Sequence, residues 1–580
     1  MFKKLLIANR GEIAVRVMRA CRDLGVSPVA IYSELDADAV HVRLADEAYN
    51  VGPGPATDSY LKIENIIEAA TRSGAEAVHP GYGFLAENGD FARAVTDAGL
   101  AWVGPQPEVI DAMGDKTAAR RAAKDAGVPT VPGTVDPVTT TQEVLAFVSE
   151  HGLPLAIKAV AGGGGKGFRV VTEEKEIEDA LVGAAREALA YFSSPEVYLE
   201  RYLERPRHIE VQVLGDASGA VLSFPERDCS LQRRHQKLVE ESPSPALDPS
   251  VREAIMEAAA RVSKQVGYRN AGTCEFLLDS DARTFYFLEM NTRLQVEHPV
   301  TELVTGFDLV RAQLLIAADE HLEFSQDDIE LHGAAIECRI NAENPAKKFM
   351  PAPGTISGYR EPGGPGVRVD SGAEPGAVVP QAYDPLIAKL ITYGSSRNEA
   401  RTRMLRALSE YRIEGIKTTI PFHRLMLADE RFVSGDYHTG TVEREMDLSA
   451  LAETAPPKPK PGEREIAERS FAVEVSGKRF TVKVREELDR QMRARKPKPP
   501  KRAGGRGGGG GEIVSAPMQG TIVKILVEQG QQVNAGDTIC VLEAMKMENS
   551  ILAHTAGKVE EIKVAAGQSV ETGATIAVIR

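Results

Sequence analysis

Two glutamates lie on a segment whose residue pattern predicts a β-hairpin. The segment GTCEFLLDSDARTFYFLEMN has turn-forming residues, DSDAR, between two runs of apolar and aromatic residues. We expect the turn to place Glu275 nearly opposite Glu289 on one face, with Asn291 further along the same side. Facing carboxylates repel each other unless a cation lies between them, and with an amide oxygen they suit Mg²⁺ on nucleotide phosphates. A salt bridge to an arginine is the structural alternative.

A run of glycines is a second candidate for binding phosphate. Residues 162–165 are all glycine and follow an apolar strand, and a backbone without side chains can approach phosphate oxygens closely. The run is not a Walker A loop, because Gly167 and the strand-like FRVV stand where a hydroxyl residue and a helix are needed. Lys158 and Lys116 supply positive charges for the same phosphates. A mobile loop without catalytic use is the alternative.

An internal repeat surrounds Lys546. APMQGTIVKILVEQGQQVNAGDTICVLE matches AHTAGKVEEIKVAAGQSVETGATIAVIR without a gap, each residue pairing with the one 37 positions later. Glycines recur at turns and apolar residues alternate within strands, so two copies predict a small β-sandwich with pseudo-twofold symmetry. The turn between the copies places Lys546 at an exposed tip, where its amine is available for modification. A solvated surface lysine is the alternative.

Several predicted domains position these residues. Residues 1–112 alternate apolar strands with helix-period segments, which is typical of a doubly wound α/β domain. Residues 113–203 predict a small lid, and residues 204–445 combine antiparallel strand patterns with helices. The remaining segments are a short β-hairpin with a Ser-Gly turn in 446–494, a flexible Pro/Lys/Gly linker in 495–511, and the repeat domain in 512–580.

Composition restricts the class of protein. With 580 residues, 43% hydrophobic and 26% charged, the chain is typical of a soluble multidomain protein. A net charge of -14 argues against a nucleic-acid partner. The five cysteines lack CxxC spacing, which favours a reducing compartment. Arg10 and Glu12 interrupt the N-terminal apolar run, and no 18-residue apolar stretch follows, so we expect a cytoplasmic protein without a membrane partner.

Five segments together resemble biotin carboxylase, a member of the ATP-grasp superfamily. They are NRGEIA, HPGYGFLAEN, AGGGGKG, ERDCSLQRRHQK and EMNTRLQVEH, and the resemblance covers residues 1 to about 444. EAMKM, residues 543–547, resembles the biotinylation motif of biotin carboxyl carrier domains more than that of lipoyl domains, whose lysine usually lacks the flanking methionines. The resemblance implies the α subunit of a biotin-dependent acyl-CoA carboxylase, an ATP-dependent ligase. Its expected fold is an α/β N-terminal domain, an ATP-grasp α+β region with a C-terminal α+β subdomain, and an all-β biotinyl/lipoyl-like carrier domain.

The resemblance also implies roles for individual residues. Biotin would be attached to Lys546, and Mg²⁺ or Mn²⁺ would be bound by Glu275, Glu289 and Asn291. ATP would be bound by Lys116, Lys158, Gly163, Gly164, Gly165, Glu200, Arg201, Tyr202, Leu203, His208, Gln232, His235 and Leu277. Bicarbonate would lie against Lys237, Arg293, Gln295 and the backbone of Val296, with Glu297 as the base that removes its proton. Arg339 would stabilise the biotin enolate, and Tyr82 would pack near the biotin ring. An ion pair of Arg339 with Glu337 or Glu343 is the structural alternative.

The implied reaction uses ATP to activate bicarbonate as carboxyphosphate, so that carrier-bound biotin can take the carboxyl group. A separate carboxyltransferase β subunit would then pass it to an acyl-CoA, with acetyl-CoA or propionyl-CoA favoured, within a hetero-oligomer whose biotin carboxylase part is dimeric. Biotin protein ligase would be a further partner. The alternatives are another ATP-grasp carboxylate–amine ligase, the biotin carboxylase component of a two-subunit pyruvate carboxylase, and a non-catalytic carrier. Where longer family members have a docking domain, this chain has the hairpin segment of residues 446–494.

Overall fold

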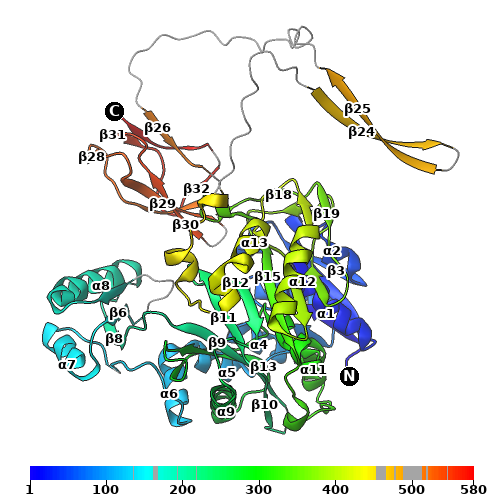
Figure 1. The fold of residues 1–580 in the computed structure, drawn as a ribbon, viewed down its shortest axis with the longest axis horizontal. Coiled ribbons are helices and arrows are strands. Elements are labelled where there is room, and N and C mark those ends of the chain that lie inside the picture. The colour runs from blue at the N-terminus through cyan, green and yellow to red at the C-terminus, as the bar shows by residue number, and fades with distance from the viewer. Residues whose placement is uncertain are drawn as a thin grey trace. The chain divides into compact units, whose positions relative to one another are not determined.

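The computed structural model describes residues 1–134, 136–160, 167–192, 194–216, 218–451, 466–475, 478–487, 512–517, 520–544, 547–571 and 573–580. The chain divides into two compact units (Figure 1), with residues 1–450 in the first and the two C-terminal β elements in the second. The predicted glycine loop, Lys546 and the predicted linker 495–511 lie outside the described residues.

The N-terminal residues form the predicted doubly wound domain. Its five strands are parallel, in the order β3-β2-β1-β4-β5. Leu5 and Ile7 pack into one apolar core and Leu6 into another, so helices cover both faces of the sheet. The strands are β1 (Lys4–Ile7), β2 (Ser27–Ser33), β3 (Glu47–Gly52), β4 (Ala77–His79) and β5 (Ala101–Trp102), and the helices are α1 (Gly11–Asp23), α2 (Val40–Leu44), α3 (Ile63–Ser73), α4 (Gly89–Asp97) and α5 (Pro107–Gly114).

A small antiparallel sheet follows, in the order β7-β6-β8. Its elements are α7 (Thr141–His151), β6 (Leu155–Ala159), β7 (Phe168–Val171), α8 (Ile177–Phe192) and β8 (Val197–Arg201). Helix α6 (Lys116–Asp125) precedes it, but the buried Ala119 and Ala123 of α6 pack into the core of the next sheet. Lys116 therefore begins a helix that leans on the central sheet.

A nine-stranded sheet forms the centre of the first unit, with the order β14-β13-β9-β11-β12-β15-β22-β20 and β10 paired to β9. Every pairing in it is antiparallel. The strands are β9 (Arg207–Gly215), β10 (Val221–Ser223), β11 (Arg227–Arg233), β12 (Gln236–Ser242), β13 (Asn270–Leu278), β14 (Phe285–Asn291), β15 (Ala334–Asn341), β20 (Val367–Ser371) and β22 (Leu386–Gly394). Strand β15 pairs with β12 on one side and with β22 on the other. These three adjacent strands therefore carry Lys237 (β12), Arg339 (β15) and Lys389 (β22).

The other elements of the first unit are short strands and the helices that pack around this sheet. The helices are α9 (Pro249–Gln265), α10 (His298–Thr305), α11 (Leu309–Ala317), α12 (Arg397–Glu410), α13 (Ile420–Ala428) and α14 (Glu430–Ser434). The strands are β16 (Glu343–Asn344), β17 (Met350–Pro351), β18 (Gly354–Thr355), β19 (Gly358–Arg360), β21 (Val378–Val379) and β23 (Arg412–Glu414). Helix α10 matters most for the site, because its apolar side packs on Ala335 and Ile391 while its N-terminus begins at the predicted bicarbonate residues.

The second unit contains the predicted hairpin, β24 (Ile466–Val475) paired antiparallel with β25 (Lys478–Glu487), and the predicted β-sandwich. The sandwich has two four-stranded sheets, β26-β33-β31-β28 and β30-β29-β27-β32. Its strands are β26 (Glu512–Ser515), β27 (Gly520–Ile525), β28 (Gln532–Val533), β29 (Thr538–Ala544), β30 (Met547–Leu552), β31 (Gly557–Ile562), β32 (Ser569–Val570) and β33 (Thr575–Ile579).

The sequence repeat explains the two sheets of the sandwich. Moving 37 positions along the chain takes β27 onto β31 and β28 onto β32, so each strand of one sheet has its copy in the other. The repeated glycines keep the same backbone conformation, with φ of 93° at Gly530 and 83° at Gly567, which a side chain would disfavour. The predicted fold class, including the all-β carrier-like domain, is confirmed.

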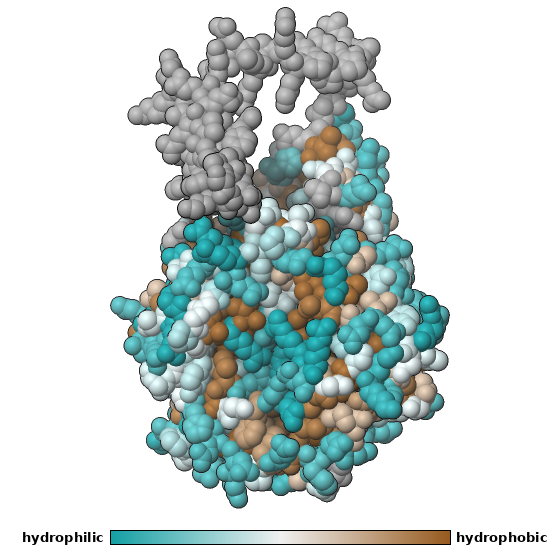
Figure 2. Space-filling view, turned by 90° about the vertical axis from the view of Figure 1, so that its right-hand side faces the viewer, coloured by the Kyte–Doolittle hydropathy of each residue, from teal (hydrophilic) through white to brown (hydrophobic). Residues whose placement is uncertain are grey.

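The polarity of the surface and the burial of the cysteines are those of an ordinary globular protein. On the face that Figure 2 shows, apolar residues gather in several areas separated by hydrophilic ones. In the described part of the chain, none of the helices is both long and apolar enough to cross a bilayer. All five cysteines are buried and free.

Candidate active site

Lys237 lies at the centre of a buried acidic cluster. Its Nζ is 2.5 Å from Glu210 Oε2, 2.9 Å from Glu275 Oε1 and 2.7 Å from Glu297 Oε1. Burial opposes a charged amine, but these carboxylates raise the pKa of Lys237 well above its ordinary value. The lysine is therefore a fixed cation that joins β9, β13 and the start of α10.

Glu297 and Arg339 form the next pair. Arg339 donates from Nη2 to Glu297 Oε2 at 2.8 Å and from Nε to Glu240 Oε1 at 2.5 Å. Burial alone would raise the pKa of Glu297, but Lys237 and Arg339 hold it well below its ordinary value. The structural alternative named for Arg339 had the wrong partners, because Glu240 and Glu297 take the place of Glu337 and Glu343.

The predicted carboxylate pair has the expected register. Glu275 on β13 is paired with Glu289 on β14, and Asn291 donates to Glu275 Oε1 at 2.9 Å. Burial and the Glu275 charge raise the pKa of Glu289, a repulsion that a cation between the two groups would relieve. Among the described residues, the ion pairs of Glu275 are with Lys237 and with His208 Nε2, at 2.9 Å, and none is with an arginine.

The side-chain oxygens of Glu275, Glu289 and Asn291 are ligands that suit a hard divalent cation. In the described residues, two sets have possible ligand atoms within 4.8 Å of one another: His208, Glu210 and Glu275, and Glu210, Cys229 and Glu297. Glu275 thus belongs to both the first of these sets and the predicted one. Although burial opposes a charged imidazole, Glu275 raises the pKa of His208.

The segment that links β14 to α10 adds donors to the same cluster. Gln295 donates from Nε2 to Glu275 Oε1 at 3.0 Å. Arg293 donates to Gln295 Oε1 at 3.0 Å and to Asn291 Oδ1 at 3.1 Å, and its Nε is 2.9 Å from Glu87 Oε2. Lys237, Gln295 and Asn291 therefore all meet on one carboxylate oxygen, which is the coordination that a small planar anion needs.

The predicted nucleotide residues form two groups. Glu200 on β8 pairs with Lys158 on β6 and with Arg120 of α6. Leu203 belongs to a small apolar cluster with Val131 and Tyr286, against which Leu277 packs, and such a cluster suits a flat base. Arg201 is 3.1 Å from Asp279, and Tyr202 accepts from Arg444 at 2.8 Å.

Four other predicted residues lie near the acidic cluster or at its margins. Gln232 is the register partner of Lys237. His235 and its neighbour Arg234 form the two-residue turn between β11 and β12 with φ of 62° and 47°, a left-handed conformation that favours glycine or asparagine. Lys116 is near enough to Glu289 to lower its pKa. Tyr82 is 5.8 Å, ring centroid to Nζ, from Lys389.

The sequence reasoning missed several residues of this site. Glu210 is fully buried between Lys237 and Arg227, whose Nε is 2.5 Å away. Glu240, Glu337 and Lys389 are also fully buried, and Glu240 and Glu337 are register partners. In the segment RHIEVQVLGD, alternation places His208, Glu210 and Gln212 on one face, and that polar face was a usable signal.

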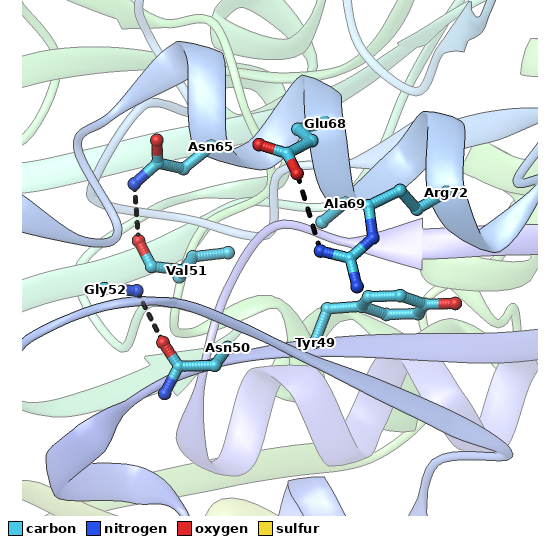
Figure 3. Close-up of a pocket in the computed structure, with 8 residues that line it drawn as sticks. All are labelled: Tyr49, Asn50, Val51, Gly52, Asn65, Glu68, Ala69 and Arg72. Atoms are coloured by element: carbon cyan, nitrogen blue, oxygen red, sulfur yellow. Dashed lines mark hydrogen bonds and ion pairs between the residues drawn. The ribbon is translucent and has the colours of Figure 1, made fainter.

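A separate hollow of about 200 Å³ lies between β3 and α3 (Figure 3). Its polar groups satisfy one another: Arg72 lies over the Tyr49 ring and pairs with Glu68 at 3.5 Å, and Asn65 donates to Val51 O at 2.7 Å. It contains none of the predicted site residues.

The antiparallel sheet with buried lysines and facing carboxylates, preceded by a small three-stranded sheet, defines an ATP-grasp ligase. Four family models match the chain: "Biotin carboxylase, N-terminal domain" at residues 1–110, "Carbamoyl-phosphate synthase L chain, ATP binding domain" at 115–325, "Biotin carboxylase C-terminal domain" at 337–444, and "Biotin-requiring enzyme" at 512–579. The chain belongs to the biotin carboxylase family, and it has the domain composition of the α component of a biotin-dependent acyl-CoA carboxylase.

Known proteins similar to the chain support this. The "Biotin-dependent acyl-coenzyme A carboxylase alpha3 subunit" of Mycobacterium leprae is 48% identical over 591 aligned positions, covering 100% of this chain and 98% of that protein. One of the pyruvate carboxylase subunits of Methanothermobacter thermautotrophicus is 53% identical over 443 positions, 76% of this chain and 90% of that protein. The biotin carboxylase domain of Hydrogenobacter thermophilus 2-oxoglutarate carboxylase, a dimer in complex with MgADP, ADP and bicarbonate, has a TM-score of 0.72 at 48% identity, covering 79% of this chain and 100% of that one.

The chain is therefore an ATP-dependent biotin carboxylase with a carrier domain for covalent biotin, and it uses ATP and Mg²⁺.

Proposed function

We propose that this chain is the α subunit of an acyl-CoA carboxylase, which carboxylates its own biotin and delivers the carboxyl group to a separate carboxyltransferase β subunit. The observation that carries this is the 48% identity to the Mycobacterium leprae alpha3 subunit over the whole chain, carrier domain included. Acetyl-CoA or propionyl-CoA is the acceptor we favour. A two-subunit pyruvate carboxylase is the second candidate, because the Methanothermobacter thermautotrophicus protein is 53% identical over 76% of this chain.

We assign bicarbonate to the donors around Glu275 Oε1 and Glu297. Lys237, Arg293, Gln295 and the Val296 N–H would bind the anion, and Glu297 would take its proton. Glu297 is ionised and fully buried, so it is in the form that accepts a proton. Lys237 would then balance the negative charge that accumulates as bicarbonate attacks the γ-phosphoryl group of ATP.

The nucleotide would lie between the small sheet and the central sheet. Leu203 and Leu277 would contact the adenine, and Glu200, Arg201, Tyr202, His208, Gln232 and His235 would line the rest of the nucleotide site. Lys116, Lys158 and the glycines at 163–165 would hold the phosphates. Glu275, Glu289 and Asn291 would hold Mg²⁺, which neutralises phosphate charge when bound. Burial and the Glu275 charge both raise the pKa of Glu289, and the repulsion from Glu275 supports this assignment, because a cation between the two carboxyl groups would relieve it.

Arg339 would act on the second half of the reaction. A guanidinium remains protonated at any relevant pH, so Arg339 can stabilise negative charge on the oxygen of the biotin ring while Tyr82 packs against that ring. Biotin itself would be joined to Lys546, which lies in the sequence between the end of β29 at Ala544 and the start of β30 at Met547.

The partners follow from the same proposal. Biotin protein ligase would modify Lys546, and the β subunit would dock in part on the hairpin β24–β25, since a two-stranded hairpin gains stability by packing against another surface. The biotin carboxylase part would be a dimer, as the Hydrogenobacter thermophilus domain is. A cytoplasmic location remains a prediction.

Three experiments test this function. Purified chain should hydrolyse ATP only with bicarbonate, Mg²⁺ and biotin, either free or attached to Lys546, and a ligase that instead joins a carboxylate to an amine would not need biotin. Lys546→Ala should abolish streptavidin labelling and keep carboxylation of free biotin, whereas Arg339→Ala should keep labelling and lose carboxylation. Co-purification of the β subunit, followed by assay with acetyl-CoA, propionyl-CoA, pyruvate and 2-oxoglutarate, then identifies the acceptor, and turnover of pyruvate alone would refute the acyl-CoA assignment.

A further inference from the structure

Two consecutive peptide groups in the proposed bicarbonate segment are each held by a buried side chain. The carbonyl of Gln295 accepts a hydrogen bond from the His298 side chain, through Nδ1 at 2.8 Å, and a longer one from the His298 backbone N–H at 3.4 Å. The carbonyl of Val296 accepts one from Lys389 Nζ at 2.9 Å. His298 and Lys389 are both fully buried and come from different elements, α10 and β22.

Because peptide groups are planar, these two side-chain hydrogen bonds fix the orientation of the two peptide groups on either side of Val296. A trans peptide is planar, so its C=O and N–H point in opposite directions as one rigid unit. The bond from His298 to the Gln295 carbonyl therefore fixes the direction of the Val296 N–H. In the described part of the chain, no group accepts a hydrogen bond from this N–H. The bond from Lys389 fixes the following peptide, which leads directly to Glu297.

The surroundings hold both side chains in the required state. A carbonyl oxygen can only accept, so His298 Nδ1 carries the hydrogen. Burial and the nearby cations Lys389, Arg16 and Arg368 keep the pKa of His298 well below its ordinary value, with Asp370 acting in the opposite sense. Glu302 also faces the ring, with Oε2 4.0 Å from Nε2. His298 is thus neutral with a defined tautomer.

Lys389 is anchored by two carboxylates. Its Nζ is 3.4 Å from Glu12 Oε2 on α1 and 3.7 Å from Asp370 Oδ2 on β20. It also lies directly across from Arg339 in the β15–β22 register. This anchoring links the position of the Val296 carbonyl to both the N-terminal domain and the central sheet.

We propose that His298 and Lys389 are positioning residues that aim the Val296 N–H at the bound anion. Neither side chain touches bicarbonate; each acts through a backbone carbonyl. The proposal rests on the proposed function, because it requires bicarbonate to be the anion beside Val296.

Amide substitutions at His298 separate this role from simple packing. An asparagine amide nitrogen reaches the place of Nδ1, whereas a glutamine amide nitrogen reaches that of Nε2. We expect His298→Asn to keep the KM for bicarbonate within about threefold of wild type, and His298→Gln to raise it roughly tenfold or more, the scale of one hydrogen bond to a charged group. The KM for ATP should change in neither variant. Lys389→Met should also raise the bicarbonate KM.

His41→Asn is the matched control. His41 is fully buried and bonds the Ile31 carbonyl at 3.3 Å through Nε2, in the N-terminal domain, so its substitution should leave the bicarbonate KM unchanged. ATP binding verifies the fold of each variant, and His298→Ala replaces His298→Gln in the comparison if the latter does not bind ATP.

Equal bicarbonate KM values for His298→Asn and His298→Gln would overturn the positioning role, and so would a wild-type value in both His298→Gln and Lys389→Met. The proposed function fails in a different way, because the wild-type chain would then hydrolyse ATP without any dependence on bicarbonate. That result would overturn both proposals.

Discussion

Replacing Glu240 with Gln should change how the stability of the first unit depends on pH. Glu240 is fully buried, bonded to Arg339 and paired in register with Glu337. Burial raises the pKa of Glu240 from 4.5 to about 7 in spite of the favourable Arg339 charge. The folded protein therefore binds this proton more tightly than the unfolded chain does. The stability that it contributes is present at low pH and is lost as the pH rises from about 4.5 through 7.

The two pKa values set the size of the effect. Relative to the protonated state, Glu240 lowers the free energy of unfolding by roughly 2 kcal/mol at pH 6 and roughly 3 kcal/mol at pH 8. Glutamine stays neutral at both pH values and keeps an acceptor oxygen for Arg339. The wild-type protein should therefore lose about 1 kcal/mol more than Glu240→Gln between pH 6 and pH 8.

Trp102 makes the measurement specific. It is the single tryptophan of the chain and lies on β5, so its fluorescence during urea unfolding reports the first unit. The exposed Glu68 provides a control, since Glu68→Gln should follow the wild-type pH dependence. If wild type and Glu240→Gln lose the same free energy between pH 6 and pH 8, Glu240 is ionised throughout and the reasoning is refuted.

The same titration bears on Arg339. A charged Glu240 cancels part of the positive potential that Arg339 offers to the biotin ring oxygen. Carboxylation of free biotin should therefore decline more between pH 7 and pH 9 in the wild type than in Glu240→Gln. Parallel profiles would show that the ionisation of Glu240 does not reach the ring.

Three further outcomes are expected. Lys237→Met should lower bicarbonate-dependent ATP hydrolysis by at least about 100-fold, and should cost about 3–5 kcal/mol in urea unfolding because three buried carboxylates lose their cation; near-normal hydrolysis would contradict the assignment. Glu289→Gln should raise the Mg²⁺ concentration for half-maximal hydrolysis roughly tenfold, and an unchanged Mg²⁺ titration would remove Glu289 from the metal site. Burial raises the pKa of the thiols, that of Cys274 to about 12, so 5,5′-dithiobis(2-nitrobenzoate) should react slowly with the folded protein and with all five cysteines in urea; rapid reaction without urea would contradict the burial.

Local patterns in the sequence were sufficient for some elements. The turn DSDAR is short, so the register of Glu275 with Glu289 followed from chain connectivity alone. The 37-residue repeat likewise predicted the sandwich, because identical spacing of glycines and apolar residues forces the two copies to form the same strands. The resemblance to biotin carboxylase supplied the residues that no local pattern could, such as Glu297 and Arg339.

Non-local pairing explains what the sequence did not predict. The alternatives for Arg339 were Glu337, two residues before it, and Glu343, four residues after it. Residues two apart on a strand are separated by roughly 6–7 Å along the strand, and Glu343 lies beyond the end of β15. Glu240 lies on the adjacent strand β12 and Glu297 at the start of α10, and both reach Arg339. Such contacts depend on the order of strands in the sheet, which the pairing of β12 with β15 determines.

The charge cluster is better explained by function than by stability. Taking an ion out of water costs several kcal/mol, and apolar residues of similar volume often stabilise a fold as well or better. Lys237 contacts three carboxylates although one would balance its charge, and Glu289 adds a fourth carboxyl group whose pKa is raised by burial and by the Glu275 charge. This surplus of negative charge lies where Mg²⁺ and the cationic donors for bicarbonate would both be required. A variant in which Lys237 is replaced by Met and Glu275 by Gln should therefore be less destabilised than Lys237→Met alone while remaining inactive, because the double change removes the cation together with one carboxylate that needs it, and His208, the other partner of Glu275, can become neutral.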